Sequence, residues 1–357
     1  MRSNLSTPLI TGRLVAKVLR HSWRDAVPDL AYLSVADFEA VTPLLYDSGA
    51  AALGWRLIDN SELAGTPSGE LLHQAYRLLT LQAAIHQTKI QRVFKAFRAD
   101  GIEPILIKGW AMARRYPQPA LRPYGDIDLI LRPGDLKAAQ SLTASEDFRD
   151  CRIDLHARVF ELADRSIDDL YARSSLAECG EERVRVLADE DHLALVSIHL
   201  LKHAAWRPLW LCDVAVLLES MKPDFDWEVC LGPDERRGNW IRAAISLAID
   251  LLGATPSGGP IETGAQTPQW LTDGVLANWA EPFTINHEPH NHRGEMKSYL
   301  THPRGFFGDL RRRWPDPIMA TVLANGSFGN RRLLRYQIHN CVKRAAHLLS
   351  RSGEPAF

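Results

Sequence analysis

The sequence predicts an α+β fold in which a small mixed sheet lies between N-terminal and C-terminal helical regions. Three observations carry this prediction: a long helical pattern ahead of the sheet, three short β-branched segments in the middle of the chain, and helical patterns after them. A chain of 357 residues is longer than most single hydrophobic cores. We therefore expect about two or three packed units.

The first long element is a helix over residues 70–99. Its apolar side chains, such as Leu72 and Phe97, recur at helical spacing. The pair Asp100-Gly101 directly after it is a helix-ending signal, because glycine readily adopts the left-handed conformation that closes a helix.

Three short strands are expected in the middle of the chain. Runs of β-branched residues bounded by proline and glycine mark them. In chain order we expect a strand at 104–108, a helical turn or two at 110–115, a strand at 126–131, a helix at 135–145 and a strand at 152–156.

Helices follow the strands. We expect them at 191–203, 209–220, 240–252 and, after a linker rich in Gly, Thr and Pro, at 331–350. The chain therefore divides into 1–69, mainly helical; 70–163, the strand-rich core; 164–253, a helical domain closing a cleft on the core; and 254–357, a linker with a mixed and helical C-terminal region.

Composition argues against several classes of protein. The formal net charge is −1, so we expect no nucleic-acid partner, since dedicated nucleic-acid binders carry a basic excess. The five cysteines form no Cys-x-x-Cys pair, which argues against a zinc ribbon or a disulfide framework. No stretch approaches the roughly 20 apolar residues of a membrane span, and no signal peptide is recognisable. We expect a cytoplasmic protein without a membrane partner.

Two carboxylates, Asp126 and Asp128, stand two residues apart at the start of the second expected strand. Residues at this spacing project from the same face of a strand, so both would point together while Ile127 and Leu129 face the core. Adjacent carboxylates repel unless a cation neutralises them, and Mg²⁺ binds through one or two carboxylates plus substrate phosphates. The pattern predicts a Mg²⁺ or Mn²⁺ site with Asp126 and Asp128 as catalytic metal ligands.

A third carboxylate, Asp154, lies on the third expected strand between Ile153 and Leu155. If the strands are neighbours, the three acids converge at one sheet edge, which suits two-metal phosphoryl chemistry. We assign Asp154 as a ligand of the second metal or as the general base. His156, two residues further on, either faces the same side and touches a phosphate or is a structural histidine. Asp-x-Asp also arises by chance at strand ends, but this context favours catalysis.

The residues around the acids fit an anionic substrate. Lys108 ends the first strand beside Gly109, where the chain can approach a phosphate closely. Arg122 precedes Asp126 by four residues and could fork onto phosphate oxygens. Gly125, directly before the acids, is a further candidate nucleotide contact.

These motifs resemble a known family. The sequence is similar to the uncharacterised bacterial nucleotidyltransferase family of the DNA polymerase β superfamily in residues 107–111 (Ile-Lys-Gly-Trp-Ala), 116–117 (Tyr-Pro) and 121–130 (Leu-Arg-Pro-Tyr-Gly-Asp-Ile-Asp-Leu-Ile). Residues 153–156 look like that family's third acidic strand, and residues 199–213 resemble its helical segment.

The resemblance implies a polymerase-β-like core, an NTP donor (we expect ATP), Mg²⁺ and release of pyrophosphate. Some members sit in gene clusters for modified peptides, which implies a peptide or small-molecule acceptor. The wider superfamily has Gly-Ser or Gly-Gly on a short helix before the acidic strand, whereas here Trp110 follows Gly109. Lys108 and Arg122 therefore carry more of the expected triphosphate contact.

A group of polar residues on the later helices leaves several interpretations open. His199 and His203 are one turn apart, with His192 on nearly the same face. Such spacing can bind a transition metal, but histidines on an apolar helix are more often core or cleft residues. An intermediate interpretation is that Lys202, His203 or Asp213 lines the nucleotide cleft between core and helices.

The leading interpretation is a nucleotidyltransferase that moves a nucleoside monophosphate from NTP to a hydroxyl-bearing acceptor, with phosphoryl transfer as the lesser variant. Two alternatives stay open. One is a toxin-like transferase acting on a protein or tRNA. The other is a nucleotide-binding regulator without turnover.

Overall fold

The structure, a computed structural model, describes residues 7–25, 30, 33–257, 267–281, 314–329, 331 and 334–351. The expected linker after residue 253 falls partly outside these ranges. Four helices lead into the sheet: α1 (Thr7–Leu19), α2 (Val35–Asp47), α3 (Ala51–Ile58) and α4 (Pro67–Ala99). After the sheet come α8 (Asp189–Lys202), α9 (Pro208–Glu219), α10 (Trp227–Leu231), α11 (Glu235–Leu252), α12 (Gln269–Trp279), α16 (Pro317–Leu323) and α17 (Leu334–Arg351).

Among the described residues the sheet has five strands in the order β3-β2-β1-β5-β4. They are β1 (Ile105–Ile107), β2 (Ile127–Ile130), β3 (Ile153–His156), β4 (Ser175–Cys179) and β5 (Glu182–Val186). Strands β2 and β3 are parallel, as are β1 and β5, whereas β1 runs antiparallel to β2 and β4 to β5. The short helices α5 (Gly109–Ala113), α6 (Leu136–Thr143) and α7 (Ile167–Arg173) connect these strands. The predicted α+β class, with a small mixed sheet between helices, is confirmed.

The sheet extends further along the chain than we expected. The sequence predicts a core that ends at residue 163, but strands β4 and β5 add residues 175–186 to the same sheet. Strand β4 forms the sheet edge and is largely exposed, so it lacks the apolar run that marked the other strands. In β5 the buried Val184 and Val186 alternate with arginines, and Gly180 turns the hairpin at φ 63°.

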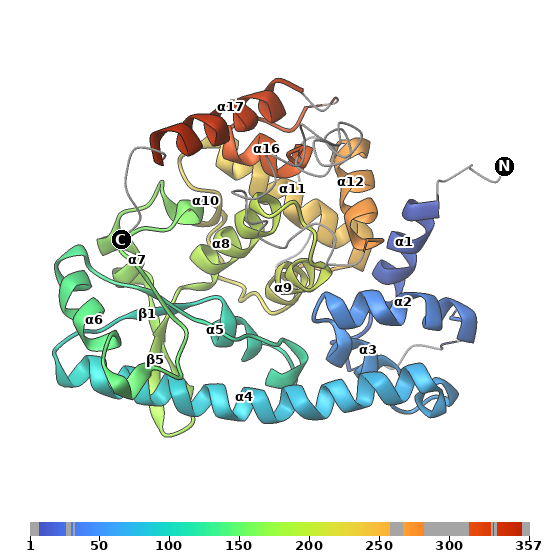
Figure 1. Cartoon of the computed structure of the whole chain (residues 1–357), viewed down its shortest axis with the longest axis horizontal. Coiled ribbons are helices and arrows are strands. Elements are labelled where there is room, and N and C mark those ends of the chain that lie inside the picture. Colours follow the sequence, from blue (N-terminus) through green and yellow to red (C-terminus); the bar gives the residue numbers. More distant parts are fainter. Residues whose placement is uncertain are drawn as a thin grey trace, which may run out of the picture.

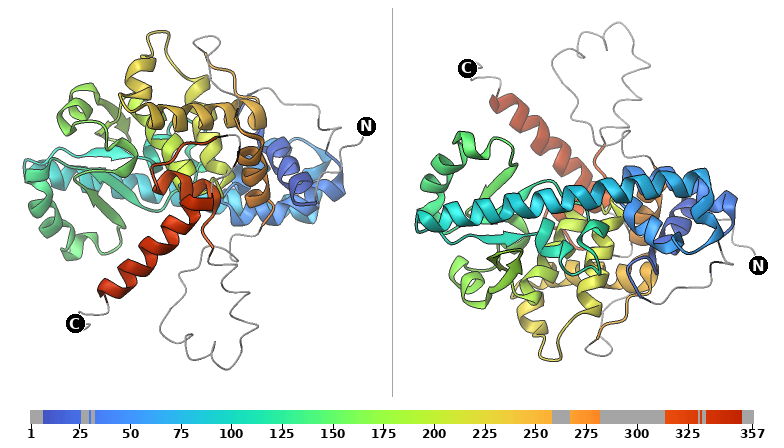
Figure 2. Two further views of the ribbon diagram at one scale, coloured as in Figure 1. Left: turned by 90° about the horizontal axis from the view of Figure 1, so that it is seen from above. Right: turned by 90° about the horizontal axis from the view of Figure 1, so that it is seen from below.

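Helix α4 connects the N-terminal helices to the sheet. It begins where the Thr66 side chain accepts a hydrogen bond from the Gly69 N–H (3.1 Å), and it ends just before Gly101, at φ 75°. The view from below shows it running the length of the molecule (Figure 2, right). Its first half packs on α2 and α3, and its second half buries Phe94 and Phe97 under the sheet.

The two faces of the sheet pack against different cores. Leu106 and Leu129 join the core over α4, whereas Ile107 and Ile130 join the larger core that contains α8, α9 and α11. Side chains alternate along a strand, so Asp128 shares the face of Ile130. The acid therefore lies on the side of the sheet that faces the later helices. Figure 1 shows α8 and α9 on the side of the sheet away from α4.

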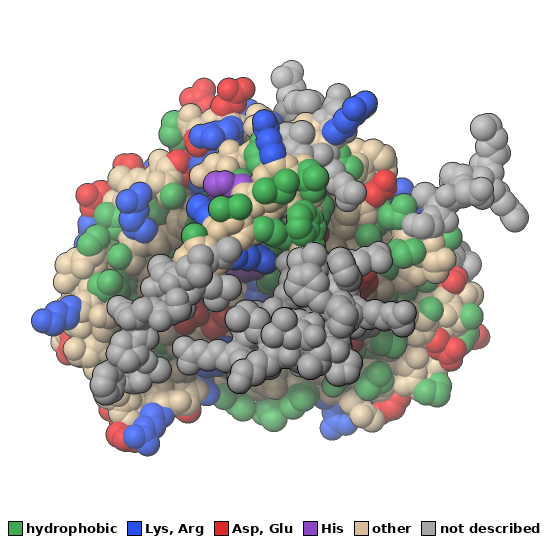
Figure 3. Space-filling view, turned by 45° about the horizontal axis from the view of Figure 1, so that its top comes forward, with side chains coloured by type: hydrophobic (Ala, Val, Ile, Leu, Met, Phe, Trp, Pro, Cys, Tyr) green, Lys and Arg blue, Asp and Glu red, His purple; other side chains and the backbone are tan. Residues whose placement is uncertain are grey.

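The described surface carries mixed charge. On the face drawn in Figure 3, Lys and Arg side chains are interspersed with Asp and Glu. Leu334, Ile338 and Val342 leave an exposed apolar row on α17. No helix in the described part of the chain is both long and apolar enough to cross a bilayer.

The contrast between the two faces of α4 is testable. Phe94 is fully buried, whereas Leu81 on the same helix is 60% exposed. We expect Phe94→Ala to lower the free energy of unfolding by about 3–5 kcal/mol, because it leaves a cavity in the core. Leu81→Ala is the matched control and should stay within about 0.5 kcal/mol of wild type. Urea unfolding followed by circular dichroism measures both, and equal effects would contradict the assigned packing.

Candidate active site

A cleft of about 370 Å³ opens between the sheet and helices α8 and α9. One wall comes from the sheet and its loops: Lys108, Gly109, Arg122, Pro123, Tyr124, Gly125, Asp126, Asp128 and Arg152. The other wall comes from the helices: His199, His203, Arg207 and Trp210. Six of the residues expected from the sequence to bind or react lie on the first wall, and His203 lies on the second.

Asp128 is the most buried acid of the cleft, at 5% exposure. Its Oδ1 lies 3.1 Å from Lys108 Nζ and 3.1 Å from His156 Nε2. Burial alone would raise the pKa of the Asp128 carboxyl, but the hydrogen bond to His156 and the charge of Lys108 outweigh it and lower that pKa. The carboxylate is therefore held in its charged form, the form that can bind a cation.

The backbone at Lys108 is unusual. Its φ is 54°, a left-handed value that non-glycine residues seldom adopt, and Gly109 follows at φ 23°. A Cβ on Gly109 would stand 3.3 Å from the carbonyl oxygen of Asp126, so the two loops approach closely here. Backbone strain of this kind gathers at functional sites, and here it brings Lys108 to the acids.

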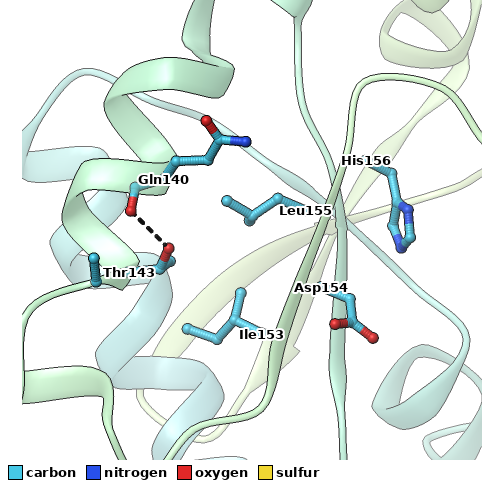
Figure 4. A pocket seen from close by; sticks show the side chains of 7 residues that line it. Gln140, Thr143, Ile153, Asp154, Leu155 and His156 are labelled. Carbon is cyan, nitrogen blue, oxygen red and sulfur yellow. Dashed lines mark hydrogen bonds between the residues drawn. The ribbon is translucent and has the colours of Figure 1, made fainter. Parts of the chain in front are cut away.

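Asp154 lies beside Asp128 but outside the cleft lining. The two aspartates are direct partners in the β2–β3 register, so their side chains leave the same face of the sheet. Figure 4 shows Asp154 and His156 on one side of β3, with Ile153 and Leu155 on the other side toward α6. Asp154 is exposed on the edge strand, where solvent or a second substrate can reach it.

The described residues do not form a complete metal-binding site by themselves. Among them, no three His, Cys, Asp or Glu side chains gather closely enough to hold an ion. Mg²⁺ requires less, because it takes one or two carboxylates and completes its shell with phosphate oxygens and water. Lys108 and His156 both contact Oδ1 of Asp128, and within the described residues no hydrogen bond reaches Oδ2. The donor set therefore fits a hard cation that obtains its remaining oxygen ligands from outside the protein.

Two expected nucleotide contacts have other partners. Arg122 donates from Nε and Nη2 to Asp213 (2.8–3.2 Å), and the Tyr116 hydroxyl donates to the same carboxylate (2.9 Å). Arg122 and Asp213 are 6% and 1% exposed. A carboxylate buried this deeply needs donors, and the forked guanidinium supplies them. Arg122 borders the cleft, but its guanidinium group holds the loop before β2 against α9. The guanidinium is therefore already paired and does not point freely into the cleft.

The expected residues of α8 separate in space. His203 lines the cleft, whereas Lys202 donates to the buried Glu161 (2.9 Å) on the turn Phe160–Leu162. His199, with Nδ1 3.2 Å from the same carboxylate, also lines the cleft. His192 points into the core, fully buried.

Two arginines of the cleft are not among the residues expected from the sequence. Arg207 follows α8, donates from Nε to the Ser48 carbonyl oxygen (2.7 Å), and reaches the cleft from the far wall. Burial and the charge of Arg122 lower its pKa to about 10. Arg152, just before β3, is exposed beside the acids. An arginine next to an acidic strand was a usable signal for Arg152, but nothing local indicated Arg207.

Comparison with family models gives one match. The model described as an uncharacterised nucleotidyltransferase matches residues 30–247, more than half of the chain. This span takes in α3, α4, the whole sheet and every residue of the cleft. Comparisons with curated proteins and with solved structures find no match.

The bracing pair yields a stability prediction. We expect Arg122→Ala to lower the free energy of unfolding by about 3–5 kcal/mol, because it leaves the Asp213 charge buried without its main partner. Arg152→Ala, an exposed arginine of the same cleft, is the control and should unfold like wild type. Thermal and urea melts measure both. Equal stability of the two variants would contradict the bracing role of Arg122.

The buried Glu161 yields a pH prediction. Burial opposes its charge, but the hydrogen bond to His199 and the charge of Lys202 lower its pKa below the ordinary 4.5. A lowered folded pKa contributes stability above pH 4.5 that is lost as the pH falls toward the folded value. The gap in unfolding free energy between wild type and Glu161→Gln should be largest at neutral pH and shrink below pH 4.5. The exposed Glu178→Gln is the control and should unfold like wild type at every pH. A difference between wild type and Glu161→Gln that stays constant or widens in acid would contradict this assignment.

Proposed function

We propose that this chain, which belongs to the uncharacterised nucleotidyltransferase family, transfers a nucleoside monophosphate from NTP to a hydroxyl-bearing acceptor with the help of Mg²⁺ or Mn²⁺. One observation carries the proposal: the Asp128 carboxylate, buried at the cleft, is held charged by Lys108 and His156 while Asp126 stands beside it on the same wall. Costly burial of a charged acid in a cleft is typical of a catalytic centre.

Asp126 and Asp128 would hold the metal, with Asp154 at its outer side. When bound, the ion neutralises phosphate charge and orients the oxygens for in-line attack. Lys108 would exchange its contact with Asp128 for a phosphate oxygen, since the incoming cation takes over neutralisation of that acid. Arg152 and Arg207 lie on opposite walls of the cleft and supply further positive charge for a triphosphate.

The acceptor would approach from the β3 edge. Asp154 is exposed there, next to Asp128 in register, and can take the proton of an acceptor hydroxyl. The acceptor oxygen then bonds to the α-phosphorus as the bond to the bridging oxygen breaks, and pyrophosphate leaves. Attack at the γ-phosphorus would instead release nucleoside diphosphate, which is the phosphoryl-transfer variant.

The acceptor we propose is a peptide or a small molecule. The formal net charge of −1 lends little support to a tRNA acceptor. All three acids are present at one end of the sheet, which favours turnover over a purely regulatory nucleotide site.

Pyrophosphate release tests the proposal. We expect wild type to release pyrophosphate from an NTP with Mg²⁺ or Mn²⁺ and a peptide or metabolite pool as acceptor. Asp126→Asn and Asp128→Asn should each lower the rate roughly a hundredfold or more, the scale of losing one preorganised charge at such a site. Asp147→Asn, an exposed acid outside the cleft, is the matched control and should leave the rate unchanged.

The outcomes separate the alternatives. Nucleoside diphosphate in place of pyrophosphate would indicate phosphoryl transfer. Full activity of Asp128→Asn would refute the mechanism. Metal-dependent NTP binding without turnover on any acceptor would favour the regulator.

A further inference from the structure

The helical wall of the cleft carries a cluster of rings. The His199 and His203 rings lie 4.5 Å apart between centroids, and each contacts Trp210, at 4.8 Å and 5.4 Å. Trp206 stands behind, edge-on to Trp210 at 5.3 Å, and is not part of the cleft lining. The three lining rings are each only partly exposed, so one side packs in the protein while the other meets the cleft.

A buried carboxylate fixes the orientation of one ring. Glu161 is 2% exposed and lies 3.2 Å from Nδ1 of His199. An ionised carboxylate only accepts hydrogen bonds, so Nδ1 carries the proton and Nε2 is the nitrogen left for other partners. Lys202 donates to the same carboxylate and keeps its negative charge balanced.

The cluster is uncharged at neutral pH. Burial, with the positive charge of Lys202 nearby, lowers the pKa of His203 to about 3. Burial lowers the pKa of His199 as well, against the influence of Glu161. A neutral imidazole offers one donor and one acceptor, whereas phosphate binding calls for cations.

Charged groups are therefore concentrated on one wall of the cleft. Lys108, Arg152 and the acids lie on the sheet wall, whereas the helical wall carries the three uncharged rings together with Arg207. A nucleoside triphosphate has the same division, with a highly charged phosphate chain at one end and a flat aromatic base with donor and acceptor edges at the other.

We infer that His199, His203 and Trp210 form the subsite for the nucleobase of the NTP, with Trp210 or an imidazole face stacking on the base and the free imidazole nitrogens reading its edge. The inference rests on the proposed function, because it places the base of the same donor whose phosphates meet Lys108 and the acids. Base stacking on aromatic side chains tolerates any base, so discrimination among bases falls to the two histidines.

Two probes separate the base subsite from the phosphate site. The first is α,β-methylene-ATP, which cannot be cleaved at the α-phosphorus, and the second is tripolyphosphate, which has no base. With the full chain and Mg²⁺, calorimetry should show that His203→Ala and Trp210→Leu each weaken the ATP analogue roughly tenfold. Both variants should bind tripolyphosphate like wild type, whereas Lys108→Ala should weaken both probes.

A matched control exists outside the cleft. Trp55 stacks on His73 at 4.2 Å between α3 and α4, so Trp55→Leu removes a similar ring from a similar partner. It should leave both affinities unchanged, and circular dichroism confirms that each variant is folded.

The possible results are distinct. Unchanged affinity of His203→Ala and Trp210→Leu for the ATP analogue, with a loss in Lys108→Ala, would place the base elsewhere and overturn the inference. An equal loss for both probes would also overturn it. If wild type binds both probes as expected but catalyses no transfer, the proposed function fails while the base subsite stands. If wild type binds neither probe, both fail together.

Discussion

A charged carboxylate buried at the end of a sheet is the constraint on which the rest of this structure depends. Asp128, 5% exposed, needs positive partners, and the chain supplies them from both neighbouring strands: Lys108 after β1 and His156 at the end of β3. The antiparallel pairing of Ile107 with Asp128 and the parallel β2–β3 register bring those partners within 3.1 Å. The order of the strands therefore places the two partners of Asp128 on either side of it.

The helices after the sheet contribute to the site of Asp128 in two ways. They bury the sheet face that carries Asp128, and they leave a cleft beside it, because α8 and α9 present rings and an arginine there instead of a close-packed apolar surface. The Arg122–Asp213 pair joins the loop before β2 to α9 and so sets the distance between the two walls. The same two residues stabilise the fold and shape the cleft, so variants of this pair will alter both stability and the site.

Sequence patterns were sufficient where the physical cause was local. Helical periodicity predicts α4, and β-branched runs predict β1, β2 and β3, the last two with their acids. These predictions succeed because the pattern of buried and exposed side chains repeats between residues that are close in the sequence. Strands β4 and β5 were not predicted, because an exposed edge strand and an arginine-rich strand lack the apolar run of a buried strand. They are recognisable only from their pairing, β5 with β1 and β4 with β5. Arg122 was interpreted as a phosphate ligand because its actual partner, Asp213, lies 91 residues away. Local charge cannot reveal a distant ion pair.

We propose that Asp128 holds the metal on which nucleotide binding depends. Electron paramagnetic resonance of Mn²⁺, titrated into the protein with α,β-methylene-ATP, measures this directly. We expect wild type to bind Mn²⁺ tightly only when the nucleotide is present, and we expect Asp128→Asn to lose this binding. Equal, nucleotide-dependent Mn²⁺ binding by Asp128→Asn would refute this role of Asp128, because the buried carboxylate would then have no part in holding the metal.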